Sequence, residues 1–152
     1  MTPEEKLKSM GLTLPNVPTP VANYVSFKLN GDTLYLSGQG PRKPDGSLYT
    51  GKVGGDVTWE EAYQHARLVG LGLLAAAKKA AGELSRVEVI KLLGMVNGVP
   101  EFADQPKVIN GCSDLLVEVL GDRGRHARSA VGMGSLPNNM TVEIEAIMRI
   151  VD

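Results

Sequence analysis

Apolar residues recur at strand spacing early in the chain and again near residue 90. The pattern predicts one strand over Asn23–Leu29 and a second over Thr33–Ser37. The Asn-Gly-Asp sequence at 30–32 predicts a hairpin between them, because Asn and Gly both tolerate positive φ. A run of apolar and β-branched residues over Val87–Val96 predicts a buried third strand.

Two more strand patterns lie near the C-terminus, on either side of a Leu-Pro-Asn-Asn turn at 136–139. In the second, period-two spacing places three apolar residues on one face: Val142, Ile144 and Ala146. Glu143 and Glu145 fall on the opposite face, and Arg128 stands near the start of the first strand. Charged groups on neighbouring strands usually face solvent or a cleft, because burying them is costly. We therefore expect Arg128 and Glu143 to share one cleft.

Capping signals and helical spacing predict three helices. The first spans Thr2–Met10 and opens with a Thr-Pro-Glu-Glu capping box. Thr58 and Glu61 have the same capping-box spacing at the start of a long amphipathic helix that ends near Gly82. Another amphipathic helix is predicted over Lys107–Leu120.

Two segments show neither the two-residue spacing of a strand nor the spacing of a helix. Three prolines between Leu14 and Pro20 exclude regular structure, so we expect an extended lead-in that lies over the domain. Residues 38–56 are rich in Gly, Pro and charge, which predicts a long loop with a short edge strand near Leu48–Tyr49. The chain has no internal repeat or linker. We expect one domain over 1–152, with 1–20 as an N-terminal extension.

The order of these elements predicts an α+β fold, in which two long helices pack on one face of a mixed β-sheet. Val, Ile and Leu side chains on both sheet faces would leave the second face in contact with water. Self-association into a small ring or barrel of sheets would cover that face, so we expect an oligomer.

Charge and cysteine content exclude several classes of function. Sixteen basic and seventeen acidic residues leave a net charge of −1, which counts against a dedicated nucleic-acid binder. One cysteine and two distant histidines predict neither a disulfide nor a metal site. No apolar run reaches the roughly 20 residues of a membrane helix, and the N-terminus lacks an export signal. We therefore expect a cytoplasmic protein.

Arg128 is a leading candidate for a functional residue, because a charge inside a strand needs a reason. Its planar guanidinium suits recognition of a carboxylate or phosphate through two parallel hydrogen bonds. A carboxylate in the same cleft, such as Glu143, can hold and deprotonate a water molecule.

Other motifs have ordinary structural explanations. Arg123 and Arg125 fit a basic loop, His65 fits a solvated helix position, and Cys112 falls on the apolar stripe of its helix. The Ser37-Gly38-Gln39-Gly40 sequence lacks the third glycine of a dinucleotide site. It fits a turn after a strand, or a loop whose backbone closes over a small ligand.

The C-terminal sequence closely resembles the signature of the RidA/YjgF family, also named L-PSP. The residues that carry the resemblance are Ala127-Arg128-Ser129-Ala130-Val131, Leu136-Pro137 and Val142–Ile147. Three upstream segments resemble the family's first strand, the end of its second strand and the start of its second long helix: Asn23-Tyr24-Val25, Leu36-Ser37-Gly38-Gln39 and Ile109-Asn110. The resemblance implies a chorismate-mutase-like fold and a homotrimer with active sites between subunits.

The resemblance also implies hydrolysis of small reactive 2-imino or enamino acids to 2-keto acids and ammonia, with no metal or cofactor. Arg128 would bind the substrate carboxylate with help from the backbone N–H of Ala130, and Glu143 would orient the attacking water. The residues implied to line the rest of the pocket are Tyr24, Ser37, Gly38 and Asn110. The protein mainly has to position the substrate and the attacking water in this reaction, because an iminium carbon is already electrophilic.

The sequence departs from the family at three places and resembles a longer-chain branch of it. Ala130 stands where members often carry Cys, and both the loop over 42–55 and the N-terminal segment through Pro20 are longer than usual. The two longer segments predict a covered or reshaped pocket mouth. Two alternatives to deamination stay open. One is a non-catalytic module that binds carboxylate metabolites, and the other is an endoribonuclease, which the near-neutral charge disfavours.

Overall fold

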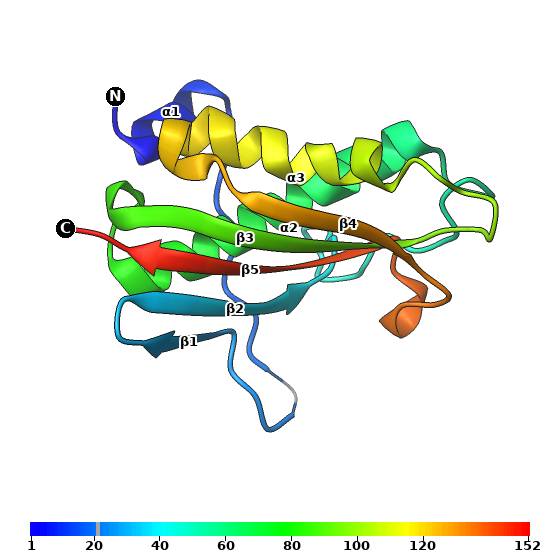
Figure 1. Cartoon of the computed structure of the whole chain (residues 1–152), viewed down its shortest axis with the longest axis horizontal. Coiled ribbons are helices and arrows are strands. Elements are labelled where there is room, and N and C mark those ends of the chain that lie inside the picture. Colours follow the sequence, from blue (N-terminus) through cyan, green and yellow to red (C-terminus); the bar gives the residue numbers. More distant parts are fainter. Residues whose placement is uncertain (21) are drawn as a thin grey trace.

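A mixed five-stranded sheet with helices on one face makes up the protein (Figure 1). The computed structural model describes residues 1–20 and 22–152. Its elements are α1 (Pro3–Ser9), β1 (Phe27–Asn30), β2 (Thr33–Gln39), α2 (Trp59–Ala81), η1 (Leu84–Arg86), β3 (Val87–Asn97), α3 (Gln105–Leu120), η2 (Gly121–Gly124), β4 (Ala127–Met133), η3 (Pro137–Asn139) and β5 (Val142–Ile150). The predicted α+β class, with both long helices on one sheet face, is confirmed.

The strands lie in the order β1-β2-β5-β3-β4, so β4 forms one edge of the sheet. β4 runs parallel to β3, and the other neighbouring pairs are antiparallel. The prediction that the last two strands are neighbours is therefore wrong, because β3 lies between them. The reason is that α3 carries the chain back along the sheet, so that β4 adds beside β3 as in a βαβ unit.

The N-terminal hairpin forms where the sequence predicts it, but with different strand limits. β1 begins at Phe27, later than predicted, and β2 extends through Gln39, into the predicted loop. Asn30 pairs with Thr33, and Gly31 takes a φ of 65° in the two-residue turn between them. A positive φ at this first turn position favours glycine, because it has no Cβ atom.

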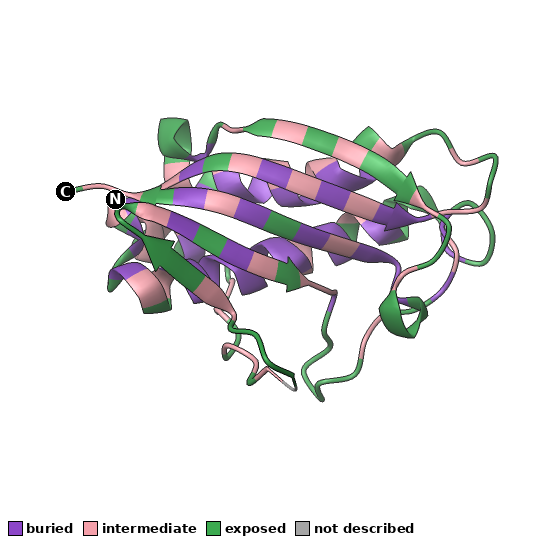
Figure 2. Cartoon of the chain, turned by 60° about the horizontal axis from the view of Figure 1, so that its bottom comes forward, coloured by how far each residue is buried: buried purple, intermediate pink, exposed green. Residues whose placement is uncertain are grey.

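Burial alternates along the strands and gives the sheet a core face and an open face (Figure 2). In β5 the three predicted apolar residues are buried, whereas Glu143 is half-buried and Glu145 is exposed. Large apolar side chains that remain exposed on the strands include Tyr35, Ile90 and Val131. The core therefore lies between the sheet and the pair formed by α2 and α3.

The N-terminal helix is tied to the rest of the chain. Both predicted capping boxes form, in Thr2 with Glu5 and in Thr58 with Glu61. Leu7 of α1 is buried in the core. The Glu4 carboxylate accepts the Leu84 N–H at 2.9 Å and lies 3.6 Å from the Lys78 ammonium. These contacts fix α1 beside α3 and the end of α2, at the edge of the helical layer.

The segment between β2 and α2 contains isolated bridges in place of the predicted edge strand. Arg42 pairs with Leu48, and Thr50 pairs with Met140 near the start of β5. These bridges bring the long loop over the end of the sheet where β2 and β5 meet. No helix in the described part of the chain is long and apolar enough to cross a membrane.

Candidate functional site

A pocket of about 250 Å³ opens where β2 and β5 meet. Four of the predicted site residues line it: Tyr24, Ser37, Gly38 and Glu143. The two longer segments predicted to reshape the pocket also contribute to its wall, through Pro18, Pro20, Arg42 and Leu48. A concavity of this size suits a small metabolite, since drug-sized ligands occupy pockets of roughly 300–1,000 Å³.

The Glu143 carboxylate reaches over Gly38 on the neighbouring strand. A Cβ atom at position 38 would overlap Oε2 of Glu143, so only glycine leaves room for the carboxylate. The pairing register also shifts between Leu36 and Gln39, which places a β-bulge at this point. Bulges of this kind re-aim side chains and are frequent beside active sites.

Burial raises the pKa of Glu143 above the ordinary value of a glutamate, and the nearby charge of Glu145 raises it further. A carboxylate whose pKa is raised is a stronger base, so it accepts a proton more readily than an ordinary glutamate. Beside it, the Ser37 hydroxyl donates to the carbonyl of Val25 at 2.6 Å. That bond commits the Ser37 hydrogen and leaves its oxygen as an acceptor in the pocket wall.

Arg128 lies on the edge strand β4, and its side chain turns toward α3. Its Nη1 donates to Oδ1 of Asn110 at 2.8 Å and to Oγ of Ser113 at 3.1 Å. Asn110 and Ser113 share one face of α3, because they are spaced one helical turn apart. Among residues 1–20 and 22–152, no carboxylate lies within ion-pair distance of this guanidinium. Its charge is therefore not neutralised by an acidic partner in that part of the chain.

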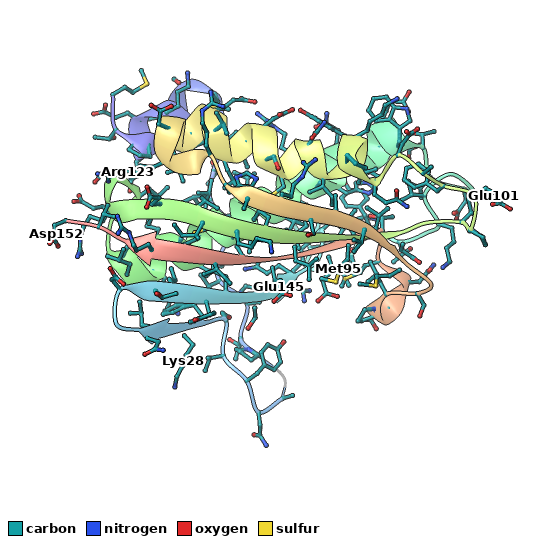
Figure 3. The ribbon with its side chains drawn as sticks, viewed as in Figure 1. Lys28, Met95, Glu101, Arg123, Glu145 and Asp152 are labelled. Carbon is teal, nitrogen blue, oxygen red and sulfur yellow. The ribbon has the colours of Figure 1, made fainter. Side chains whose placement is uncertain are left out.

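Arg128 and Glu143 point to opposite faces of the sheet. Arg128 pairs in register with Leu92, which pairs with Ala146 on its other side, and both partners are buried beneath the helices. Glu143 instead pairs with Met95, further along β3 (Figure 3 labels Met95). The Cα atoms of Arg128 and Glu143 are two strands apart across the sheet and three residues apart along it, which corresponds to about 14 Å. The predicted shared cleft therefore does not form within one chain.

The predicted site residues fall into two groups. The first lines the pocket and comprises Tyr24, Ser37, Gly38 and Glu143. The second lies at the β4 edge and comprises Asn110, Arg128 and Ala130. In the described residues no strand pairs with the outer side of β4, and the backbone groups of an edge strand are open to pairing with a ligand or another chain.

Sequence reasoning missed two residues beside Arg128. Nε2 of His126 lies 2.9 Å from Oγ of Ser113, and its Nδ1 lies 2.6 Å from the carbonyl oxygen of Gly124. The fold brings Ser113 and His126 together across the turn that connects α3 to β4. The signal in the sequence was the helical spacing that places Ser113 one turn after Asn110.

His65 is buried, and the prediction of a solvated position is wrong. Its Nδ1 lies 2.8 Å from Oγ1 of Thr141, and its ring stacks on Tyr49 with centroids 4.3 Å apart. The long loop folds over this face of α2, which the helical period alone does not reveal. Burial lowers the pKa of His65. Cys112 is buried in the core as predicted, and burial raises its pKa to about 12.

The described residues contain no cluster of side chains that could form a metal site. Across 1–20 and 22–152, no three or more His, Cys, Asp or Glu side chains lie close enough together to hold a metal ion. The charged side chains described at the two groups are the Glu143 carboxylate and the Arg128 guanidinium, and the Arg42 guanidinium also lines the pocket.

Comparisons with known proteins agree with the predicted resemblance. The profile of a family described as "YjgF/chorismate mutase-like, putative endoribonuclease" matches residues 4–146. Protein TCP17 of Trypanosoma cruzi is 40% identical over 146 residues, which cover 95% of this chain and 91% of TCP17.

Solved structures of similar proteins also agree with the predicted resemblance. The protein Atu1372 of Agrobacterium tumefaciens, whose function is unknown, is 49% identical with a TM-score of 0.90, covering 98% of this chain and 94% of that one. A structure from Shewanella oneidensis that bears the same endoribonuclease description is 36% identical with a TM-score of 0.94, covering 99% of this chain and 100% of that one. The chorismate-mutase-like fold is confirmed.

Proposed function

Because this chain belongs to the YjgF/chorismate mutase-like family, we propose that it hydrolyses small 2-imino or enamino acids to 2-keto acids and ammonia. The observation that carries the proposal is the carboxylate of Glu143, which lies half-buried in a small pocket with a raised pKa. Such a group is suited to take a proton from water and to return it to a departing amine.

The proposed site is assembled from two copies of the chain, because Arg128 and Glu143 face opposite sides of one sheet. One copy supplies the pocket around Glu143, and the β4 edge of the next copy supplies Arg128, Asn110 and the backbone of Ala130. A head-to-tail contact of this kind forms a ring when its rotation closes, and a ring of three would be the trimer that the family resemblance implies. The same contact would cover exposed apolar side chains on the strands.

The reaction proceeds through three proton transfers, two of which involve Glu143. Arg128 binds the substrate carboxylate, and Glu143 accepts a proton from water as the water oxygen bonds to the iminium carbon. The product of this step is a neutral carbinolamine beside a protonated Glu143. Glu143 then returns the proton to the nitrogen, and the C–N bond breaks to release ammonia. The ammonia takes the proton of the hydroxyl group, which yields the 2-keto acid and an ammonium ion. The charge and atoms of iminium plus water are conserved.

Two features of the protein favour this function over RNA cleavage. The pocket of about 250 Å³ suits a small molecule, and the net charge of −1 provides no general attraction for a polyanion. A non-catalytic module would keep the Arg128 contacts but would release no keto acid.

The proposal is tested by keto-acid release from a 2-imino acid generated in the assay by an amino-acid oxidase. Wild-type protein, Arg128→Ala and Glu143→Gln are compared, with the exposed Glu101→Gln as a charge-matched control. Faster release with wild type and the control than with the two site variants supports the proposal. Equal rates in all four proteins contradict it. Binding of the keto acid without turnover identifies the module, and salt-sensitive RNA cleavage identifies the nuclease.

A further inference from the structure

A directional series of hydrogen bonds connects Arg128 to the turn before β4. The carbonyl of Gly124 can only accept, so its 2.6 Å contact with Nδ1 of His126 requires a proton on that nitrogen. In the neutral imidazole Nε2 is then an acceptor, and the Ser113 hydroxyl donates to it at 2.9 Å. The oxygen of Ser113 in turn accepts from Nη1 of Arg128 at 3.1 Å. Each donor therefore meets an acceptor.

The surroundings of His126 favour the neutral ring that this order requires. Burial lowers the pKa of His126, the hydrogen bond to the Gly124 carbonyl opposes that change, and the positive charge of Arg128 adds to it. The side chains that hold Arg128 from α3, Asn110 and Ser113, are uncharged.

Two glycines hold the elements that carry this series at close distance. A Cβ atom at Gly124 would overlap the carbonyl oxygen of Leu116 in α3. A Cβ atom at Gly111 would overlap the carbonyl oxygen of Tyr63 in α2. Backbone therefore packs on backbone at both places, and the Gly124 carbonyl has little freedom to move away from His126.

These contacts define the orientation of the guanidinium plane. Both hydrogens of Nη1 are committed, one to Asn110 and one to Ser113. The Nε–Nη2 edge is then the edge that can form two parallel bonds with a carboxylate. Without Ser113 and its partner, a single bond to Asn110 would leave the plane free to rotate.

We infer that Ser113 and His126 act in series as positioning residues that fix the Arg128 guanidinium for carboxylate binding. The inference rests on the proposed role of Arg128 as the carboxylate anchor. Because the two residues act through one another, loss of either should have the same effect as loss of both.

The first test measures the dissociation constant of pyruvate, a short 2-keto acid, by calorimetry. Ser113→Ala and His126→Ala should each weaken binding about fivefold to tenfold, and the double variant should bind no more weakly than the weaker single variant. Ser113→Thr, which keeps the hydroxyl, should bind like wild type. Arg125→Ala, whose side chain is 72% exposed, is the matched control for the loop. Additive losses would overturn the inference, and so would the absence of a loss beyond that of the control if Arg128→Ala itself weakens binding.

A second readout does not depend on ligand binding. The NMR signal of the Arg128 Nε–H group, assigned by its absence in Arg128→Ala, reports the order of the guanidinium. The order should fall in Ser113→Ala and His126→Ala and stay at the wild-type level in Ser113→Thr and Arg125→Ala. Unchanged order in the first two variants overturns the inference. If the order falls but Arg128→Ala binds pyruvate as well as wild type does, the positioning role stands and the proposed function fails.

Discussion

Gly38 and Glu143 lie so close on neighbouring strands that a Cβ atom on Gly38 would overlap Oε2 of the glutamate. The obstructed atom is the end of a flexible side chain, so a larger residue would displace the carboxylate without breaking the strand pairing. Position 38 therefore controls where the proposed water activator sits, and the register shift in β2 between Leu36 and Gln39 falls at the same place.

Replacing Gly38 should separate activity from stability. Gly38→Ala is expected to lower the turnover number about 100-fold, because a displacement of about 1 Å costs that much in a positioned site. The urea midpoint should change little. Gly134→Ala is the matched control, since a Cβ atom there meets no heavy atom within 4 Å. Wild-type turnover in Gly38→Ala would refute the placement of Glu143.

Arg128 should act mainly on substrate affinity. Arg128→Ala removes a charge-assisted bidentate contact and is expected to lower kcat/KM about 100-fold, chiefly through a higher KM. Arg128→Lys should recover only part of the loss, because an ammonium group cannot form two parallel bonds. Arg125→Ala, on the exposed loop, should retain wild-type kinetics. Steady-state assays on these variants decide the point, and a normal KM in Arg128→Ala would exclude the anchor role.

Glu145 should shift the pH at which the proposed activity appears. Its negative charge contributes to the raised pKa of Glu143, so Glu145→Gln should lower that pKa. If ionised Glu143 accepts the proton of water, the acid limb of the pH–rate profile moves to lower pH in this variant. Glu101→Gln, at the tip of the loop between β3 and α3 (Figure 3), should leave the limb in place. A shift toward higher pH would contradict the assignment.

Glu143 should also reduce stability at neutral pH. Its pKa is raised in the folded protein, so its stabilising contribution is complete below the unfolded pKa and is lost as pH rises through the folded pKa. Glu143→Gln does not titrate. Its free energy of unfolding relative to wild type should therefore be larger at pH 7 than at pH 4, in urea titrations at one protein concentration. A difference that shrinks as pH rises would mean that the pKa is lowered in the fold.

Signals between residues close together in the sequence were sufficient to predict much of the fold. The capping boxes at Thr2 and Thr58 start helices where predicted, and the alternation around Glu143 correctly separates core from open face. These features depend on residues close together in sequence. The one-sided helical layer followed from the order of the elements.

Strand neighbours and site geometry depend on distant residues, and the sequence did not reveal them. The turn at 136–139 indicated that β4 and β5 run in opposite directions, but β3 occupies the place between them. For the same reason Arg128 and Glu143 lie apart in one chain. His126 and Ser113 meet only because the turn after α3 folds back on the helix, and His65 is buried only because a remote loop covers it.

The central claim is that one copy supplies Glu143 and the next supplies Arg128. Co-expression of Arg128→Ala and Glu143→Gln chains in equal amounts tests it most directly. In randomly mixed trimers about a quarter of the sites would contain both intact residues. At substrate concentrations well below KM, where each variant alone is nearly inactive, keto-acid release should therefore recover to about a quarter of the wild-type rate. Mixed assemblies that remain as inactive as the separate variants would contradict the account.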